Sequence, residues 1–219
     1  MDLEQLKELE IPNKQEVRNK ILDDALKTEN PILIQFALAI GADWTTGGDR
    51  LLVYAVQQGK IELVQKLVPT ISNGATIAME VAVAHDQIEI ANWLLEKGTV
   101  VYIDRKCIEK HSNTVRKLLN GNRQARANIQ YEALEGAVCL KNNAAEMLET
   151  LLEFLKRSSH KEFAKWLVNL ADYTVDTECV ECMDVMRKQG LDLAYVNTKY
   201  HTQVMRKYLE ENGIEVTIF

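Results

Sequence analysis

The chain has 219 residues and carries 26 Lys and Arg against 32 Asp and Glu, which gives a formal net charge of −6. Apolar residues at 47% and charged residues at 26% exclude wholesale disorder. No apolar run approaches the ~20 residues of a membrane-spanning helix, and the N-terminus is acidic and amphipathic instead of leader-like, so we expect a cytoplasmic protein without a membrane partner.

Turn signals and apolar periodicity predict an all-α fold of stacked helix–turn–helix repeats, an α-solenoid. We expect an N-terminal capping helix over 1–17, clear repeats over 18–120, and divergent repeats with a C-terminal cap over 121–219, continuous with the first stack. Residues 120–128 form a polar, basic break and are the expected hinge or sub-domain boundary. The helical pairs are predicted near 18–43, 49–70, 75–98, 101–120, 129–156 and 160–192, followed by a last helix near 202–212.

Small residues recur in the first helix of each predicted pair, where close packing against the next pair requires them. These positions are Ala25, Ala55, Ala82, Cys107, Cys139 and Thr174. Three of the second helices end in glycine, at Gly41, Gly98 and Gly190, where a left-handed cap is expected. Gly59 instead falls in the turn between two helices.

Three segments of the chain resemble the ankyrin-repeat family. Gly41-Ala42-Asp43 matches the G-A-D of that family, and 55–67 (AVQQGKIELVQKL) and 82–98 (AVAHDQIEIANWLLEKG) match its core pattern. The T-P-L-H tetrapeptide that opens a typical repeat is missing, so the repeats are divergent, and another helical-hairpin solenoid is the alternative. The resemblance implies a non-catalytic module, an adaptor or inhibitor, which binds a protein partner through its concave face and inter-repeat loops.

Candidate partner-binding residues lie in the predicted loops and turns and in the basic break. Trp44 follows the first repeat directly and is expected to project from a loop, because an exposed aromatic side chain is a good anchor for a partner. The candidates are Trp44, Thr45, Gln57, Gln58, His85, Arg116, Lys117, Arg123 and Arg126. Trp93 and Trp166 are expected in the core. Drift from the family pattern would suit a viral or bacterial effector.

The charge distribution bears on a second hypothesis, a nucleic-acid-associated regulator that uses the basic stretch 110–126. Residues 1–100 contain 9 basic and 15 acidic side chains, whereas 101–219 contain 17 of each. A general nucleic-acid binder needs a basic surface that displaces counterions from phosphates, so nucleic acid is the less favoured partner. The acidic first half could instead meet a basic protein surface.

A third hypothesis is a zinc deaminase or hydrolase, because His160, Glu162, Cys179 and Cys182 resemble the H-x-E…P-C-x-x-C signature. Glu178 stands where that signature has proline, and the intervening residues are predicted to be helical instead of a strand. We therefore expect structural thiols, and no metal, cofactor, small-molecule substrate or catalytic residue.

Overall fold

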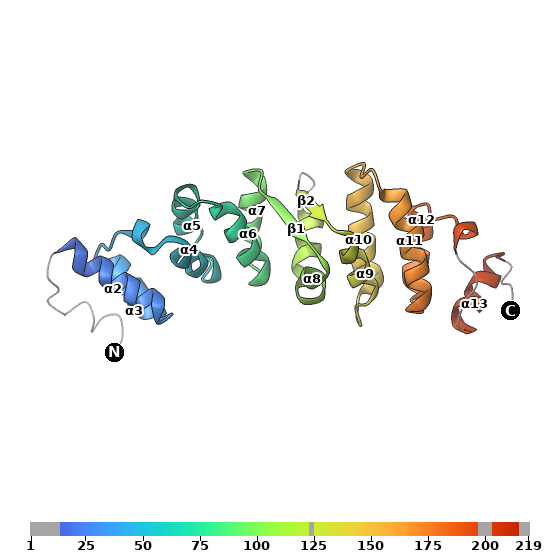
Figure 1. Ribbon diagram of the computed structural model, residues 1–219, viewed down its shortest axis with the longest axis horizontal. Helices are drawn as coiled ribbons and strands as arrows, with labels where there is room; N and C mark the ends of the chain where they lie inside the picture. Colours follow the sequence, from blue (N-terminus) through green and yellow to red (C-terminus); the bar gives the residue numbers. More distant parts are fainter. Residues whose placement is uncertain (1–13, 123–124, 197–202, 215–219) are drawn as a thin grey trace. The chain divides into compact units, whose positions relative to one another are not determined.

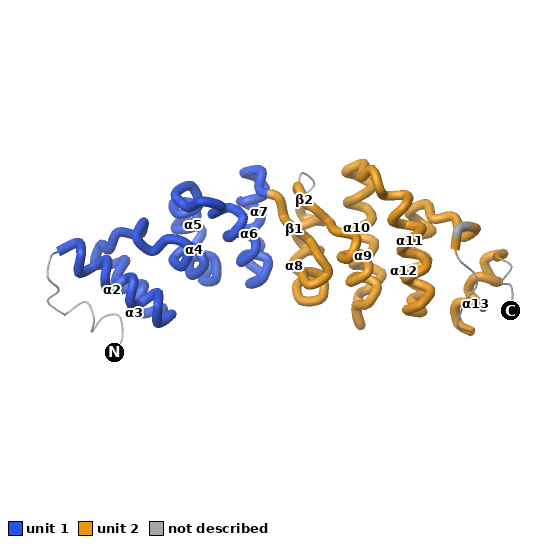
Figure 2. Tube along the Cα trace, viewed as in Figure 1, with its two compact units in different colours: residues 1–99 blue, residues 100–219 orange. Residues whose placement is uncertain are grey.

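A computed structural model describes residues 14–122, 125–196 and 203–214, and these residues are mostly helical. The chain forms two compact units, Met1–Thr99 and Val100–Phe219 (Figure 2). The break at 120–128, predicted to be the boundary, lies inside the second unit. Most of the predicted capping helix over 1–17 lies outside the described residues, and its end belongs to the first described helix.

The first unit is built of helical pairs (Figure 1). α2 packs against α3, α4 packs against α5 and α6, and α6 packs against α7. These elements coincide with the predicted pairs near 18–43, 49–70 and 75–98. Their bounds are α2 Gln15–Lys27, α3 Pro31–Ala39, a 3₁₀ turn Trp44–Gly47 (η1), α4 Gly48–Gln57, α5 Ile61–Leu67, a 3₁₀ turn Val68–Thr70 (η2), α6 Gly74–Ala84 and α7 Ile88–Glu96.

The same turn joins the two helices of each pair in the first unit. At each turn a backbone N–H bonds to the carbonyl oxygen five residues earlier: Asn30 to Ala25 at 3.0 Å, Lys60 to Ala55 at 2.8 Å and Gln87 to Ala82 at 2.8 Å. The residue before each of these donors has positive φ, as a Schellman cap requires. The three alanines of the predicted small-residue column are therefore equivalent, and each is at most 1% exposed.

The predicted glycine caps are confirmed. Gly41, Gly98 and Gly190 end their helices with φ of 86°, 87° and 110°, and Gly59 occupies the turn between α4 and α5 with φ of 64°. A side chain with a Cβ atom disfavours this left-handed conformation.

The second unit opens on a short strand that was not predicted. β1 (Val100–Ile103) pairs in parallel with β2 (Arg126–Ile129), and α8 (Arg105–Gly121) connects them. α8 begins at Asp104, whose side chain accepts from the Cys107 N–H at 2.8 Å, and it is kinked at His111. Because β2 pairs with β1, the segment 120–128 is tied to residues that precede α8, which explains why the chain does not divide there.

The rest of the second unit is helical, as predicted. α10 packs against α8, α9 and α12, and α11 packs against α9 and α12. The bounds are α9 Tyr131–Val138, α10 Ala144–Arg157, α11 Phe163–Asp176, α12 Val180–Gln189, a 3₁₀ turn Leu193–Tyr195 (η3) and α13 Gln203–Glu211. Within the described residues, no helix combines the length and hydropathy that crossing a bilayer demands.

The predicted small-residue column is only partly correct in the second unit. Thr174 is buried, Cys107 is half-buried, and Cys139 is exposed. α9 ends at Val138 and Cys139 is its C-cap residue, so the buried position three residues before the cap, which Ala25 occupies in α2, is taken by Gly136. Cys139 was therefore wrongly assigned to the packing column.

Candidate functional site

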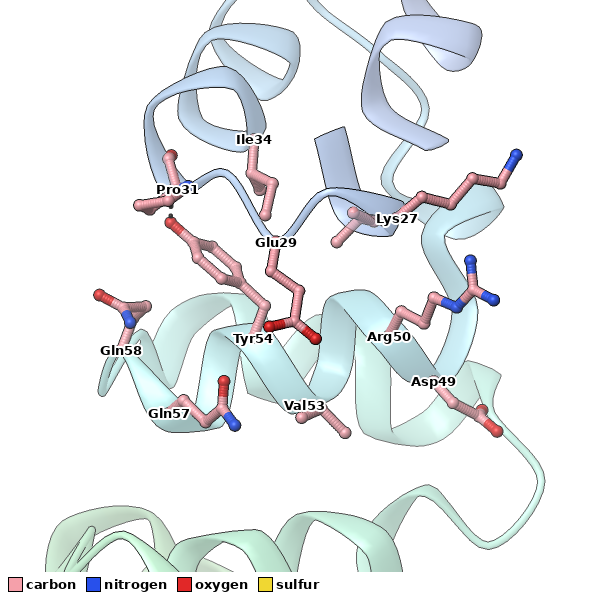
Figure 3. Close-up of a pocket in the computed structure, with 11 residues that line it drawn as sticks. Lys27, Glu29, Pro31, Ile34, Asp49, Arg50, Val53, Tyr54, Gln57 and Gln58 are labelled. Atoms are coloured by element: carbon pink, nitrogen blue, oxygen red, sulfur yellow. Dashed lines mark hydrogen bonds between the residues drawn. The ribbon is translucent and has the colours of Figure 1, made fainter. Parts of the chain in front are cut away.

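An open groove of about 540 Å³ lies along α4 in the first unit (Figure 3). Helix α4 forms one side of it, and the end of α2, the following turn and the start of α3 form the other. Its lining residues are Leu26, Lys27, Glu29, Pro31, Ile34, Asp49, Arg50, Val53, Tyr54, Gln57 and Gln58.

The helical period explains which α4 side chains reach the groove. Arg50, Val53, Tyr54, Gln57 and Gln58 are spaced i, i+3, i+4, i+7 and i+8, which places them on one face of a helix. The intervening positions 51, 52, 55 and 56 are fully buried in the core of the unit. One face of α4 thus stabilises the unit while the other remains available to a ligand.

Tyr54 stands between the two sides of the groove (Figure 3). Its hydroxyl donates to the Pro31 carbonyl oxygen at 3.4 Å, and the amide of Gln35 donates to the same hydroxyl at 3.5 Å. Asn30 caps α3 by accepting from the N–H groups of Ile32 and Leu33, at 3.1 and 3.2 Å. The start of α3, which forms one rim, is therefore held in place by local hydrogen bonds.

The charged side chains of the groove are unequally neutralised. Lys27 forms ion pairs with Asp23 at 2.5 Å and Asp24 at 3.8 Å. The hydrogen bond to Asp23 and its charge raise the pKa of Lys27. Within the described part of the chain, no ion pair involves Glu29, Asp49 or Arg50. The unpaired groove charges therefore sum to one net negative charge.

Three of the predicted partner-binding residues come together at the end of α4. Gln57 and Gln58 line the groove, and the Nε2 atom of Gln57 lies 3.4 Å from the Nε2 atom of exposed His85. The side chain of Gln87 donates to the Gln57 carbonyl oxygen at 3.0 Å, which links two successive turns. The turn after α4 and the turn after α6 are thus connected by side-chain hydrogen bonds.

Trp44 and Thr45 lie at the opposite end of α4. Trp44 is half-buried in η1, which packs against α2 and α4, and it does not line the groove. Both N–H and hydroxyl of Thr45 donate to Asp43 Oδ1, at 3.0 and 2.7 Å. These hydrogen bonds lower the pKa of Asp43. The structure therefore separates these two residues from Gln57 and Gln58 by the length of α4.

The predicted basic residues belong to the second unit and do not form one patch of free cations. Arg116 is ion-paired with Glu146, and Lys117 also has a polar or charged partner. Arg126 is exposed on β2, and Arg123 lies outside the described residues. Pairing to carboxylates reduces the charge that this stretch offers to a phosphate backbone.

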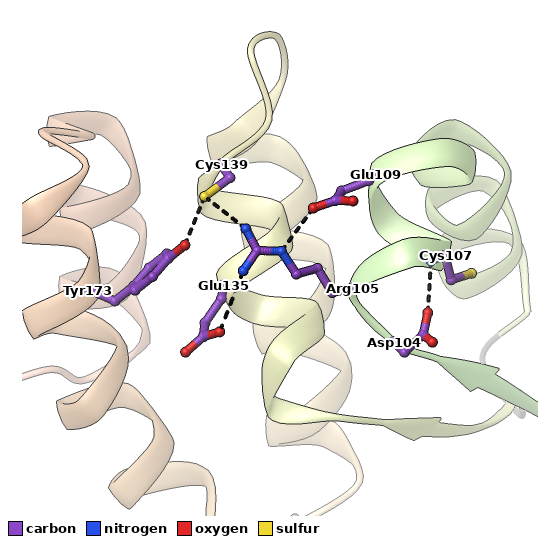
Figure 4. Close-up of polar contacts among 7 residues, drawn as sticks. All are labelled: Asp104, Arg105, Cys107, Glu109, Glu135, Cys139 and Tyr173. Atoms are coloured by element: carbon purple, nitrogen blue, oxygen red, sulfur yellow. Dashed lines mark hydrogen bonds and ion pairs between the residues drawn. The ribbon is translucent and has the colours of Figure 1, made fainter.

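A polar cluster that the sequence did not reveal joins α8, α9 and α11 (Figure 4). Arg105 Nε donates to Glu109 at 2.8 Å, and the guanidinium lies 4.0 Å from Glu135 and 3.8 Å from the Cys139 sulfur. The Cys139 sulfur is 3.0 Å from the Tyr173 hydroxyl, and this hydrogen bond raises the pKa of Tyr173. The cluster connects three helices through exposed and half-buried groups.

The residues of the zinc hypothesis do not gather as ligands. In the parts of the chain that the structure describes, no three His, Cys, Asp or Glu side chains are placed to hold a metal ion. The His160 ring lies 4.4 Å from the ring of half-buried Trp166, and α11 occupies the segment between Glu162 and Cys179. Trp166 and Trp93 were both expected in the core, and both are half-buried.

Sequence reasoning identified Gln57 and Gln58 but missed the other α4 residues of the groove. The helical period could have found them, because Arg50, Val53 and Tyr54 lie on the same face of α4 as Gln57 and Gln58.

Comparisons of the chain with protein families, with curated proteins and with solved structures found no match.

Proposed function

We propose that the chain is a non-catalytic protein-binding module, an adaptor or inhibitor, whose α4 groove holds an extended segment of a basic partner protein. The observation that carries this proposal is the groove itself, a volume of about 540 Å³ with an apolar floor and polar ends. Exposed Pro31 and half-buried Val53 and Tyr54 supply apolar surface, and complete burial of one aliphatic side chain contributes at most about 1.5–3 kcal/mol.

The polar ends of the groove suit a peptide backbone. The side-chain amide of Gln58 is exposed and has no hydrogen-bond partner among the described residues, so it offers both a donor and an acceptor to an extended chain. The divergent ankyrin resemblance supports the same class of role, since such arrays bind partners through inter-repeat surfaces.

Charge favours a segment that carries Lys or Arg beside an aliphatic residue. Glu29 and Asp49 are exposed carboxylates without ion pairs among the described residues, and Arg50 offsets only one of them. Residues 1–99, the whole first unit, carry 9 basic and 15 acidic side chains, which would steer a basic partner toward the unit.

The test begins with a random peptide library displayed on phage and selected on the full-length chain. Selected peptides are then synthesised with a fluorophore, and their affinity is measured by fluorescence anisotropy. We expect Lys or Arg next to aliphatic residues in the selected peptides. The Glu29→Lys variant should weaken their binding roughly tenfold or more, because it replaces attraction with repulsion inside the groove.

The matched control is Glu80→Lys, which makes the same charge change at an exposed position of α6 outside the groove. It should change affinity less than about twofold, because Glu80 does not line the groove and solvent screens exposed charges that make no direct contact. Selection of no peptide, or equal binding to wild type and Glu29→Lys, would contradict the proposal. A loss with Trp44→Ala and none with Glu29→Lys would place the contact at η1 and also contradict it.

A further inference from the structure

The first turn of α12 holds two cysteines in unequal environments. Cys179 is the N-cap residue of α12, which spans Val180–Gln189, and Cys182 is the third residue of that helix. Cys179 is half-buried and Cys182 is 0% exposed, and both are free thiols. Residues three apart in a first turn face each other at ~5–6 Å between Cβ atoms, close enough for a disulfide after a small adjustment.

We propose that Cys179 and Cys182 form a redox-active dithiol that is oxidised to an intramolecular disulfide by low-molecular-weight disulfides. Cys179 is the attacking thiol, because it is the accessible one and stands at the positive end of the α12 dipole, which stabilises a thiolate. Cys182 is the resolving thiol, because burial keeps it from external reagents while it remains within reach of Cys179.

The exchange proceeds in two balanced steps. The Cys179 thiolate attacks one sulfur of the oxidant RSSR, forms a mixed disulfide and releases the other half as RS⁻, which takes up a proton. Cys182 then loses its proton and attacks the Cys179 sulfur, and the second RS⁻ leaves and is protonated. The protein loses two hydrogens, and the oxidant becomes two thiols.

The contacts of the pair agree with these roles. The Cys182 thiol hydrogen-bonds to the Cys179 sulfur, and this bond lowers the pKa of Cys179 to about 7 despite its partial burial. The same hydrogen bond and burial raise the pKa of Cys182. The Cys179 thiol also donates to the Glu181 carboxylate at 4.0 Å, and the negative charge of Glu181 acts against this lowering of the Cys179 pKa.

The test uses the full-length reduced chain, with glutathione disulfide as the oxidant. After incubation, the protein is unfolded in guanidinium chloride so that every free thiol is accessible, alkylated with iodoacetamide, and digested, and the peptides are mapped by mass spectrometry. We expect the peptide with Cys179 and Cys182 to lose two hydrogens and take up no alkyl group, while Cys107 is alkylated. Alkylation of both Cys179 and Cys182 under conditions in which exposed Cys139 has reacted would overturn the proposal.

Two variants separate the roles. In Cys182→Ser, a glutathione adduct on Cys179 should persist, because the resolving thiol is missing. In Cys179→Ser, oxidation of the peptide should slow roughly tenfold or more, since buried Cys182 must react alone. A glutathione adduct that persists equally on Cys179 in wild type would show that Cys182 does not resolve it and would contradict the proposal. Circular dichroism checks the fold of each variant, and the wild-type mapping decides the question if a variant unfolds.

Discussion

The two units differ in regularity, charge and chemistry. The first unit reuses one Schellman turn between the helices of each pair and carries all of the net charge of −6. The second unit has balanced charge, a parallel strand pair, a kinked α8 and all four cysteines. The unit with similar turns between its helices carries an acidic groove, whereas the less regular unit contains the polar cluster and the four cysteines.

The largest expected effect comes from opening a cavity in one core. Leu52 in α4 and Leu148 in α10 are both 0% exposed, and either change to alanine should lower the local free energy of unfolding by about 2–5 kcal/mol. Hydrogen exchange followed by mass spectrometry should show the loss in 14–99 for Leu52→Ala and in 100–196 for Leu148→Ala. Ile32→Ala, at a residue 44% exposed, is the control and should cost under ~0.5 kcal/mol.

An equal loss of protection in both units for either leucine variant would show that the two cores unfold as one. The two units would then differ in composition and not in folding.

The next largest expected effect is a difference in alkylation rate between two thiols of the second unit, Cys179 and Cys107. Hydrogen bonding from Cys182 lowers the pKa of Cys179 to about 7, whereas burial and the charge of Asp104 raise the pKa of Cys107 to about 11. Only the thiolate reacts, so Cys179 alkylation should rise with pH and level off above about 7, while Cys107 should stay slow until the pH approaches 11.

The size of this difference follows from two opposing terms. At pH 7 the thiolate fractions differ by nearly four orders of magnitude, but the lower-pKa thiolate is the weaker nucleophile, which leaves roughly a hundredfold ratio of rates. Time-resolved alkylation with iodoacetamide, followed by peptide mapping, measures the ratio of the Cys179 and Cys107 rates. Equal alkylation rates of the two thiols at pH 7 would contradict the prediction that Cys179 reacts faster.

Helix caps should give an intermediate effect in each unit. Asn30 caps α3 and Asp104 caps α8 through side-chain hydrogen bonds, so Asn30→Ala and Asp104→Ala should each cost about 0.5–2 kcal/mol in their own unit. Local hydrogen exchange measures both. Lys60→Ala is the control, since Lys60 stands at the same position of α5 without a capping bond, and a cost as large there would remove the capping explanation.

The smallest expected effect concerns the pair formed by Arg116 and Glu146. Arg116 is half-buried and Glu146 is exposed, so solvent screens the pair. Arg116→Ala should therefore lower the free energy of unfolding by at most about 1 kcal/mol, and by less at high salt. A double-mutant cycle with Glu146→Ala isolates the pair. A coupling free energy above about 2 kcal/mol would mean that this pair stabilises the second unit more than solvent screening permits.

Local sequence signals located most helices and their ends. The glycines at 41, 98 and 190 predicted left-handed helix caps, and Gly59 predicted a turn between two helices. These signals succeed because capping and φ preference depend on neighbouring residues only. The strand at 100–103 also had a signal, a β-branched and aromatic run of Val, Val, Tyr and Ile, but its partner 126–129 had none comparable.

The sequence by itself thus determined a mostly helical chain with repeated turns and an acidic first half. Only the tertiary structure decided the parallel pairing of β1 with β2, the exposure of Cys139 and the groove that places Glu29 opposite α4. Each of these depends on contacts between residues far apart in the chain, which no local propensity encodes. The same holds for Cys179 and Cys182: their spacing is in the sequence, but packing of α12 buried one thiol and left the other accessible.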